Sequence, residues 1–409
     1  MPNSSSPTPA PASDRHPLRL MAVLCALMGF ASISTDFYLP AMPAMGHALH
    51  ASAGEMERTV AGYLVGFSLG QLFWGPVGDR FGRKRPIGIG LVLFIIGSAG
   101  CALSGSANEV IAWRVVQSSG ACASVVLSRA MVRDLYGPER AGQMMSTLIT
   151  VMAIAPLIGP LLGGEILALA GWRAIFWTLV AVGVITGIGL ATVPETLPPE
   201  RRGTASLVQA FGDYRLLVRD RVVMGCALIG GAYYFGVYAY IAGSPFVFIT
   251  YSGLSPSAYG MLFGLGIVSI MAANMLNVRL LPRYGSAPLI KAGALVSGLS
   301  GVALGLAART GWGGLAALAV PCFIFCGASG LMVANTMARA MNHRPQQAGA
   351  VSALLGAAQY GFGMLGSFSV SLLANGTPMP MGGIIAASGV AAVLAAYAMP
   401  RAHSRPYQG

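Results

Sequence analysis

Residues 75–84 read Gly-Pro-Val-Gly-Asp-Arg-Phe-Gly-Arg-Lys and join two long apolar stretches of the chain. Gly78 and Gly82 allow a positive φ angle or a close approach of two backbones, as a tight turn requires. Asp79 can pair with an arginine or stabilise the N-terminus of a helix. The basic residues that follow are typical of a loop at the lipid headgroups on the cytoplasmic side of a membrane. An acid, glycines and arginines at these spacings indicate more than an ordinary basic loop.

The chain around this loop has the composition of a membrane protein. Hydrophobic residues make up 55% of its 409 residues and charged residues only 9%, which is far from the composition of soluble proteins. A membrane-spanning helix needs about 20 apolar residues. We therefore expect an all-α polytopic membrane protein with twelve transmembrane helices, at residues 18–40, 55–77, 86–106, 109–131, 142–167, 173–194, 222–247, 257–279, 287–307, 314–336, 348–373 and 382–400.

The basic residues predict the orientation of these helices, because Lys and Arg near span ends are retained in the cytoplasm. With the N-terminus inside, 21 of the 25 basic residues fall on the cytoplasmic side. We therefore expect both termini to be cytoplasmic. A polar segment divides the spans six and six, which predicts a tail at 1–17, a six-helix bundle at 18–194, a cytoplasmic linker at 195–221, a second six-helix bundle at 222–400 and a tail at 401–409.

Composition and motifs also exclude several classes of function. The net charge of +12 is explained by arginines that face anionic lipid headgroups, so we expect no nucleic-acid partner. No Gly-rich phosphate loop ending in Lys-Ser/Thr is present, which argues against direct ATP coupling. An enzyme in the bilayer would need a nucleophile with a base, or a metal cluster. No histidine falls in a predicted span, so we expect no catalytic residue and no metal site.

The loop at 75–84 resembles the signature loop between the second and third spans of the major facilitator superfamily. Residues 155–164, Ala-Pro-Leu-Ile-Gly-Pro-Leu-Leu-Gly-Gly, resemble the helix motif of its drug–proton antiporters. Residues 114–117, Arg-Val-Val-Gln, resemble its membrane-embedded arginine motif. Three short stretches are similar to the bicyclomycin-resistance (Bcr/CflA) type of antiporter: 36–43, 131–136 and 194–197.

This resemblance implies two bundles that alternate access to a central cavity, a conformational-switch loop and an export function. The switch loop comprises Gly75, Asp79, Arg80, Gly82, Arg83 and Lys84. The antiporter helix motif comprises Pro156, Gly159, Pro160, Gly163 and Gly164. Prolines in this motif bend the helix, and glycines allow close helix packing. The chain departs from the arginine motif at Ser118, where the family usually has Gly, and we expect a looser helix contact there.

Asp36 is the leading candidate for proton coupling, together with Arg114. A carboxylate in the bilayer costs roughly 2.5–3.5 kcal/mol on insertion scales, and only Asp36 and Glu165 of the 13 acids lie inside long apolar runs. Asp36 and Arg114 fall at similar depth in the outer half of the first bundle. The alternatives for Asp36 are a static ion pair or an interfacial position. Glu165 is a candidate second acid, with a hydrated interfacial glutamate as the alternative.

The remaining outer acids, Glu55, Glu57 and Glu109, lie at predicted loop edges, and we expect them to be solvated. For the substrate cavity, Tyr63, Phe67 and Gln71 share one helix face at spacings of four residues. Aromatic walls with a few polar groups suit a drug site of low selectivity, although core packing or a lipid-facing position is the alternative for each residue. The cavity candidates are Tyr38, Tyr63, Phe67, Gln71, Tyr234, Tyr238, Asn274, Gln359 and Tyr360.

These observations favour a proton-coupled multidrug efflux transporter that exports amphipathic, bicyclomycin- or phenicol-like drugs by alternating access. We expect a monomer in the bacterial cytoplasmic (inner) membrane, with the lipid bilayer and a small-molecule drug as partners. Protons are the coupling ion, and no other cofactor is expected. The alternatives are a proton-linked transporter of a small metabolite and a sensor that binds without transporting.

Overall fold

The structure is a computed structural model that describes residues 17–136, 138–203, 212 and 214–399. The predicted tails at 1–17 and 401–409, except Pro17, and residues 204–211 and 213 of the predicted linker lie outside the described residues. Every regular element within the described ranges is a helix, as the composition predicts.

The first half of the chain contains seven α-helices and two short 3₁₀ turns in the described ranges. Their bounds are α1 Pro17–Asp36, η2 Leu39–Ala41, α2 Met42–Ala48, α3 Ala53–Phe81, α4 Lys84–Leu103, α5 Ala107–Leu135, α6 Pro138–Ala170, α7 Trp172–Ala191 and η3 Pro199–Arg201. The first predicted span, 18–40, is thus a helix that ends at Asp36 and is followed by a turn and the short α2.

The second half begins at Arg221. Its elements are α9 Arg221–Pro245, η4 Phe246–Tyr251, α10 Pro256–Tyr284, α11 Ser286–Thr310, α12 Gly314–Gly327, α13 Ser329–His343, η5 Pro345–Gln347, α14 Ala348–Leu373 and α15 Met379–Ala398. Asp220 caps α9 by accepting hydrogen bonds from the amides of Val222 and Val223 at 2.9 and 3.2 Å. Such a side-chain acceptor satisfies N–H groups that have no partner inside the helix.

The two halves share a local pattern in α3 and α10. Each helix is 29 residues long and begins after a serine cap, Ser52 or Ser255. Each ends at a glycine with positive φ, 88° for Gly82 and 74° for Gly285, a conformation that glycine adopts without a steric penalty. In both turns an arginine lies over the ring of the residue that follows it. The distance from Cζ to the ring centroid is 5.5 Å for Arg80 and Phe81, and 5.4 Å for Arg283 and Tyr284. The weak sequence echo between the halves therefore corresponds to equivalent structure.

Eleven helical segments of the described chain are long and apolar enough to cross a membrane. The α6 region contains a shorter apolar helix, Ile154–Ala170. Large apolar side chains are exposed along the surface, among them Leu69, Ile89, Leu103, Ile185 and Leu265. A soluble monomer rarely exposes so much apolar surface, whereas hydrocarbon solvates it. The chain is a multi-pass membrane protein that requires a lipid bilayer.

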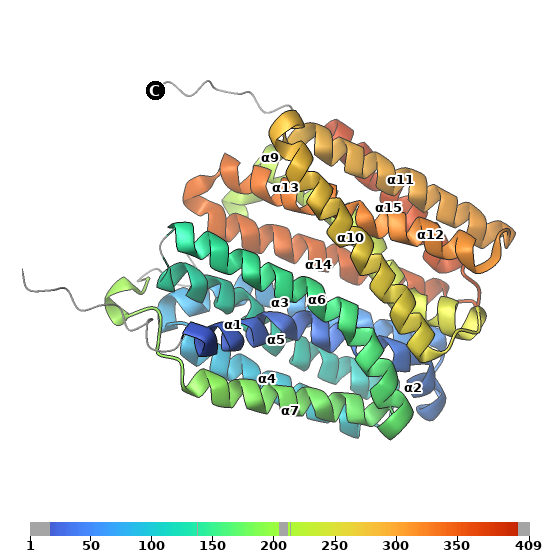
Figure 1. Ribbon diagram of the computed structural model, residues 1–409, viewed down its shortest axis with the longest axis horizontal. Helices are drawn as coiled ribbons and strands as arrows, with labels where there is room; N and C mark the ends of the chain where they lie inside the picture. The colour runs from blue at the N-terminus through green and yellow to red at the C-terminus, as the bar shows by residue number, and fades with distance from the viewer. Residues whose placement is uncertain (1–16, 137, 204–211, 213, 400–409) are drawn as a thin grey trace, which may run out of the picture.

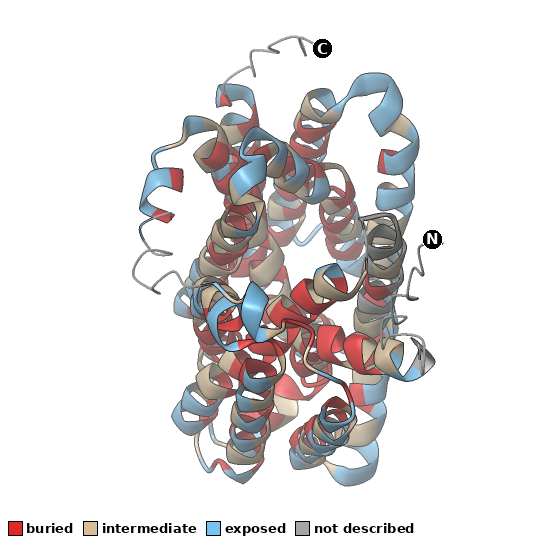
Figure 2. Cartoon of the chain, turned by 90° about the vertical axis from the view of Figure 1, so that its left-hand side faces the viewer, coloured by how far each residue is buried: buried red, intermediate tan, exposed pale blue. Residues whose placement is uncertain are grey.

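The helices run back and forth between two ends of the molecule (Figure 1). We name the end with residues 82–83 and 192–203 the linker face, and the end with residues 104–106 and 311–313 the opposite face. Helices of each half pack mainly on one another, and the halves meet where α3 packs on α14 and α6 packs on α10. Seen from the linker face, buried residues lie inside the helix layers and exposed residues lie at the periphery (Figure 2).

The predicted span 314–336 lies within one candidate membrane-spanning segment, Gly314–His343, but its helix is interrupted. The structure breaks it at Ala328 into α12 and α13. The Tyr233 hydroxyl donates to the carbonyl oxygens of Phe325 and Cys326 at 3.0 and 2.9 Å. These interhelical hydrogen bonds engage carbonyls next to the break and help to satisfy them within the bilayer.

The helix contact at Ser118 is close rather than loosened. Gly66 on α3 packs directly against the Ser118 hydroxyl and the Val115 carbonyl, and a Cβ atom at Gly66 would collide with both. The Ser118 hydroxyl donates to the Val115 carbonyl at 3.0 Å, so its polar group is satisfied within its own helix. A glycine on the partner helix therefore provides the space that the family usually gains from glycine at position 118.

Candidate functional site

Arg114 on α5 is fully buried inside the first half. Its Nη1 donates to the carbonyl oxygen of Ser34 at 2.7 Å and to Oε1 of Gln117 at 2.8 Å. Gln117 is held in turn, because its Nε2 donates to the hydroxyl of Ser98 at 2.8 Å. The Gln of the Arg-Val-Val-Gln motif thus orients the arginine, and the hydrogen bond to Ser34 ties α5 to α1.

Two tyrosines enclose the Arg114 guanidinium. Its Cζ lies 4.1 Å from the ring centroid of Tyr38 and 4.4 Å from that of Tyr63. An arginine over an aromatic face is stabilised by the quadrupole of the ring, most strongly where water is excluded. The Tyr38 hydroxyl is hydrogen-bonded to Thr59 at 3.1 Å and the Tyr63 hydroxyl to Ser34 at 2.7 Å. The structure therefore places both predicted cavity tyrosines as supports of the buried cation.

Part of the Arg114 hydrogen-bonding capacity is unused. Its Nε and Nη2 are buried and have no hydrogen-bond partner within the described chain. Leaving a buried donor unpaired costs about 1–3 kcal/mol, and more for a charged group. The guanidinium therefore retains donors for an anionic or polar partner.

Asp36 lies at the last position of α1 and is only 5% exposed. Arg114 reaches the same end of α1, because it donates to the carbonyl of Ser34, two residues before Asp36. The two side chains form no ion pair within 4.0 Å, since the carboxylates that pair with arginine in the described residues are Asp79, Asp134 and Asp220. The last turn of α1 carries no basic residue, and the C-terminal end of a helix dipole disfavours a negative charge. Asp36 is thus buried without a fixed counter-ion.

The glycines of the antiporter helix motif face Asp36. A Cβ atom at Gly159 would lie 3.0 Å from the Asp36 Cβ, and one at Gly163 would collide with the Phe37 carbonyl. The two glycines are one helical turn apart and present one smooth strip to the end of α1. Only glycine allows α6 to approach the Asp36 segment this closely.

Another face of the same motif contacts the second half. A Cβ at Gly260 on α10 would lie 3.0 Å from the Pro160 carbonyl, and one at Gly164 would lie 3.4 Å from Pro256. Glu165, the predicted second acid, is exposed and accepts a hydrogen bond from the Ser257 hydroxyl at 3.2 Å. Helix α6, with Pro156 and Pro160 inside it, therefore lies between Asp36 and the second half.

Five predicted cavity residues form one aromatic cluster between the halves. Phe67 on α3 lies 4.5 Å from Tyr360 on α14, measured between ring centroids. The remaining centroid distances in the cluster are 5.9 Å for Tyr63–Phe67, 6.1 Å for Tyr234–Tyr238, 5.9 Å for Tyr234–Tyr360 and 6.1 Å for Tyr238–Tyr360. The cluster is joined to Arg114 through Tyr63, so aromatic surface from both halves adjoins the buried cation.

The polar cavity candidates are distributed differently. Gln71 is buried on α3 against α14. Gln359 is buried, and its Nε2 has no hydrogen-bond partner within the described residues. Asn274 has an exposed side chain, whereas Asn277, almost one turn further along α10, is buried and accepts a 2.7 Å hydrogen bond from Asn335. Sequence analysis did not single out Asn277, because helical phase alone does not say which asparagine faces a neighbouring helix.

The predicted switch loop is built around Arg83, which is 6% exposed. Its Nη1 donates to Asp79 at 2.7 Å and its Nε donates to Asp134 on α5 at 2.8 Å. The Lys84 ammonium donates to the Ala191 carbonyl at 2.9 Å. Arg80 lies over its neighbouring ring, and a Cβ at Gly75 would meet no atom within 4 Å. The loop therefore fixes α3, α5 and α7 to one another at the linker face.

Glu195 completes this network. Its Oε1 accepts from the amides of Arg83, Thr196 and Leu197 at 2.8, 3.0 and 3.1 Å, and its Oε2 accepts from the Lys84 amide at 3.2 Å. It thereby caps the N-terminus of α4, where a negative charge is favourable. Burial opposes its ionisation, but these amide hydrogen bonds outweigh burial and hold the Glu195 pKa below its ordinary value. The Pro-Glu-Thr-Leu stretch pointed to Glu195 without giving its role.

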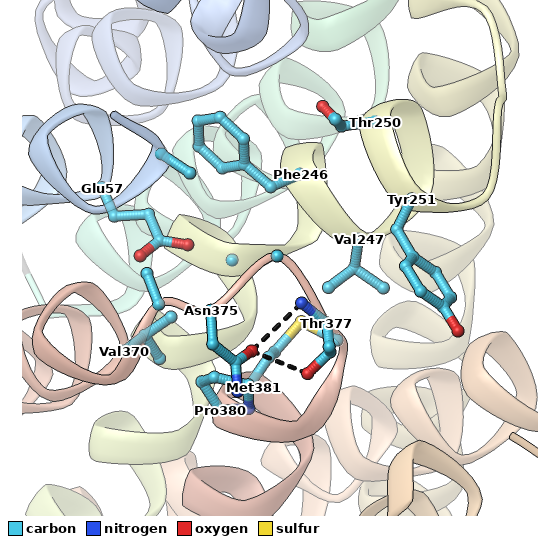
Figure 3. Close-up of a pocket in the computed structure, with 14 residues that line it drawn as sticks. Glu57, Phe246, Val247, Thr250, Tyr251, Val370, Asn375, Thr377, Pro380 and Met381 are labelled. Atoms are coloured by element: carbon cyan, nitrogen blue, oxygen red, sulfur yellow. Dashed lines mark hydrogen bonds between the residues drawn. The ribbon is translucent and has the colours of Figure 1, made fainter. Parts of the chain in front are cut away.

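The expectation that Glu57 is solvated is wrong. Glu57 is 3% exposed, and its Oε2 is buried without a hydrogen-bond partner in the described chain. It lies in the second turn of α3, near a helix end, where sequence reasoning expects contact with water. The second half covers it in the folded protein (Figure 3).

The sequence profile of the Major Facilitator Superfamily matches residues 22–367. The chain belongs to this superfamily. It is 32% identical over 391 residues to the uncharacterized MFS-type transporter YdgK of Bacillus subtilis, covering 95% of this chain and 96% of that protein. It is 30% identical over 363 residues to a bicyclomycin resistance protein homolog of Haemophilus influenzae, covering 88% and 91%. The chain is therefore a transporter and not an enzyme.

The fold agrees with this membership. The structure superposes on a crystal structure of a D-xylose-proton symporter with a TM-score of 0.72, at 19% identity, covering 93% of this chain and 96% of the symporter chain. At this level of identity the similarity concerns the fold alone. The Haemophilus influenzae relative supports the resemblance to the bicyclomycin-resistance type that the motifs indicate.

The Glu195 network generates a prediction about the linker face. Glu195→Gln removes the charge that favours the α4 cap, so hydrogen exchange at the amides of Arg83 and Lys84 should become several-fold faster at pH 7. Glu200→Gln, a change of an exposed acid in the same segment, should leave that exchange unchanged. Equal protection of these amides in wild type and Glu195→Gln would contradict the capping role.

The same network has a pH dependence with a defined sign. Because the folded-state pKa of Glu195 is lowered, its stabilising effect is present above the ordinary glutamate value of about 4.3 and is lost as the pH falls through the lower folded-state value. The melting-temperature difference between wild type and Glu195→Gln should therefore be constant near neutrality and should shrink below about pH 4.

Proposed function

We propose that this transporter exports amphipathic drugs, of the bicyclomycin or phenicol kind, in exchange for protons. The observation that carries the proposal is the placement of Asp36, which is buried at the end of α1 and unpaired, while Arg114 binds the carbonyl of Ser34 two residues earlier. A carboxyl group held in a permanent ion pair would stay ionised throughout a transport cycle. A buried carboxyl group without a fixed counter-ion can alternate between neutral and charged forms.

Arg114 supplies the charge that such an alternation requires. Its unpaired nitrogens, Nε and Nη2, are donors for the Asp36 carboxylate after the proton has left. The guanidinium is held by Gln117 and by the carbonyl of Ser34, which lies two residues before Asp36 in the chain. A small shift of α1 therefore changes the separation of Asp36 and Arg114. A cationic or polar drug that enters the cavity stabilises the charged carboxylate in the same way, and its binding therefore releases the proton.

Helix α6 is the proposed link between Asp36 and the movement of the halves. Gly159 and Gly163 contact the Asp36 segment, while Pro160 and Gly164 contact α10. Packed interfaces of this kind have discrete arrangements and deform little. A change at Asp36 that alters the packing of α1 on α6 therefore biases the contact of α6 with α10.

The aromatic cluster is the proposed cargo site. It contains rings from α3, α9 and α14, so both halves contribute to it, and Gln71 and Gln359 adjoin it with polar groups. Broad aromatic surfaces with few directional polar groups accept chemically different amphipathic ligands. The connection through Tyr63 to Arg114 places such a ligand beside the proton-coupling pair.

We further propose twelve spanning helices, with α6 as the twelfth, and a cytoplasmic linker face that holds both termini. The basic residues of the linker face, such as Arg83 and Arg202, support this orientation. The bacterial relatives favour the cytoplasmic membrane of a bacterium as the location. We propose that the chain acts as a monomer without a nucleic-acid partner and uses protons alone as its coupling ion. The membrane potential then contributes about 2.3 kcal/mol per charge per 100 mV.

Asp36→Asn tests the proton-coupling role. The amide cannot exchange a proton, so proton-driven drug accumulation in everted membrane vesicles should be abolished, while the variant still elutes as a folded monodisperse protein in detergent. Glu165→Gln, a matched change of the exposed acid, should retain most of the transport. Full coupled transport by Asp36→Asn would overturn the assignment. Proton-driven uptake of a radiolabelled metabolite into proteoliposomes, with no drug transport, would favour the metabolite alternative.

Tyr360→Ala tests the cargo site. Removing the ring that contacts Phe67, Tyr234 and Tyr238 should raise the dissociation constant of a transported drug about tenfold, which corresponds to ~1.4 kcal/mol. Tyr360→Phe keeps the ring and should bind nearly as tightly as wild type. Fluorescence quenching or scintillation proximity measures both values. Unchanged affinity in Tyr360→Ala would place the cargo elsewhere.

A further inference from the structure

Glu57 occupies a pocket that both halves build at the opposite face. Glu57 and Ala53 of α3 form one side of the pocket, and the other lining residues belong to α9, η4, α14, the 374–377 segment and α15. The carboxyl group points toward the segment that carries Asn375 and Thr377 (Figure 3). The halves touch immediately beside it, since the Ser367 hydroxyl donates to the Glu57 carbonyl at 3.2 Å.

The pocket offers the carboxylate no counter-ion. Its lining contains no Lys, Arg, His or Asp, and Tyr251 of η4 is the one other titratable side chain in it. Asn375 uses its Oδ1 to accept from the Thr377 amide and hydroxyl at 3.1 and 2.7 Å. Within the described residues, no ion pair and no side-chain hydrogen bond of Glu57 is formed, and its Oε2 is fully buried.

None of the charged groups near this part of α3 pairs with Glu57 within the described residues, although Arg58 is half-buried and its Nε has no hydrogen-bond partner there. On the same helix, Glu55 accepts from the Ser52 amide and hydroxyl in a capping box, and Arg58 makes no ion pair with Glu57 in the described chain. Helix α2 packs on α3 and η4. His47, within α2, and His50, just after it, are exposed. A buried carboxylate without a cation or a donor is strongly disfavoured, so this closed arrangement accommodates the neutral acid.

We propose that Glu57 is a second proton-binding site, on the opposite face, whose protonation is required for the two halves to close there. When the halves separate, water reaches the carboxyl group and it ionises. When they close on α14 and η4, it must take up a proton from the side to which that face opens. The site is distinct from Asp36, because Glu57 lies on α3 and its pocket is closed by residues of the second half. It rests on the proposed function only in assuming that the halves separate at this face.

The experiment measures closure of the opposite face as a function of pH, in a variant whose residue 36 cannot bind a proton. Spin labels are attached at Gly105, where a side chain meets no neighbour, and at Trp312, which is 79% exposed. One label sits on each half, in a background without the native cysteines. In Asp36→Asn, electron–electron distance distributions should shift to the short, closed distance as the pH falls from 8 to 5. If one proton is taken up on closure, the ratio of closed to open protein changes by at most about tenfold per pH unit.

Two further variants identify the group responsible. Adding Glu57→Gln, which mimics the protonated acid, should give the closed distance at every pH and abolish the titration. Adding Glu55→Gln, a matched change two residues away that preserves the capping box, should leave the titration intact. The proposal is overturned if Glu57→Gln retains the titration with its midpoint unchanged, or if Asp36→Asn alone shows no titration. Drug export is not part of this readout, so failure of the proposed function leaves the result interpretable.

Discussion

The burial of one guanidinium inside a membrane protein is the constraint on which this site depends. Arg114 is inaccessible to water, and an isolated cation in such a place is strongly disfavoured. The surrounding groups compensate in part: a carbonyl oxygen from α1, an amide oxygen from its own helix and two tyrosine faces. The Gln117 amide and the two tyrosine hydroxyls are each held by a further hydrogen bond, so parts of α1, α3, α4 and α5 are arranged around one charge.

The hydrogen bonds to Arg114 do not satisfy all of its donors, and we propose that the remaining donors take part in proton exchange. Two nitrogens of Arg114, Nε and Nη2, remain without partners in the described chain, and Asp36 is buried without a fixed counter-ion. A fully satisfied ion pair would be stable and inert. In the proposed mechanism, a proton and the guanidinium compete for the Asp36 carboxylate, and a polar ligand can take the place of either. The glycines of α6 bring that competition into contact with the second half, through a helix packed on α1 and on α10.

Much of the fold is predictable from the sequence, because length and hydropathy identify spanning helices without tertiary information. The similar depth of Asp36 and Arg114 is predictable from their positions in the apolar spans, whereas the binding of Arg114 to the Ser34 carbonyl is not. Glu57, Asn277 and the break at Ala328 were missed for a shared reason. Whether a residue near a helix end meets water, and whether a carbonyl is engaged by a neighbouring hydroxyl, depends on packing between distant helices. This packing cannot be predicted from the local sequence of one helix, because it depends on residues far apart in the chain.

Proton release on drug binding tests the central claim most directly. Purified transporter in weakly buffered detergent is mixed with a drug, and the liberated protons are counted with a pH indicator. The account predicts that wild-type protein releases protons when drug binds, and that Asp36→Asn binds drug but releases none. Equal proton release from both proteins would contradict the claim that Asp36 carries the exchanged proton.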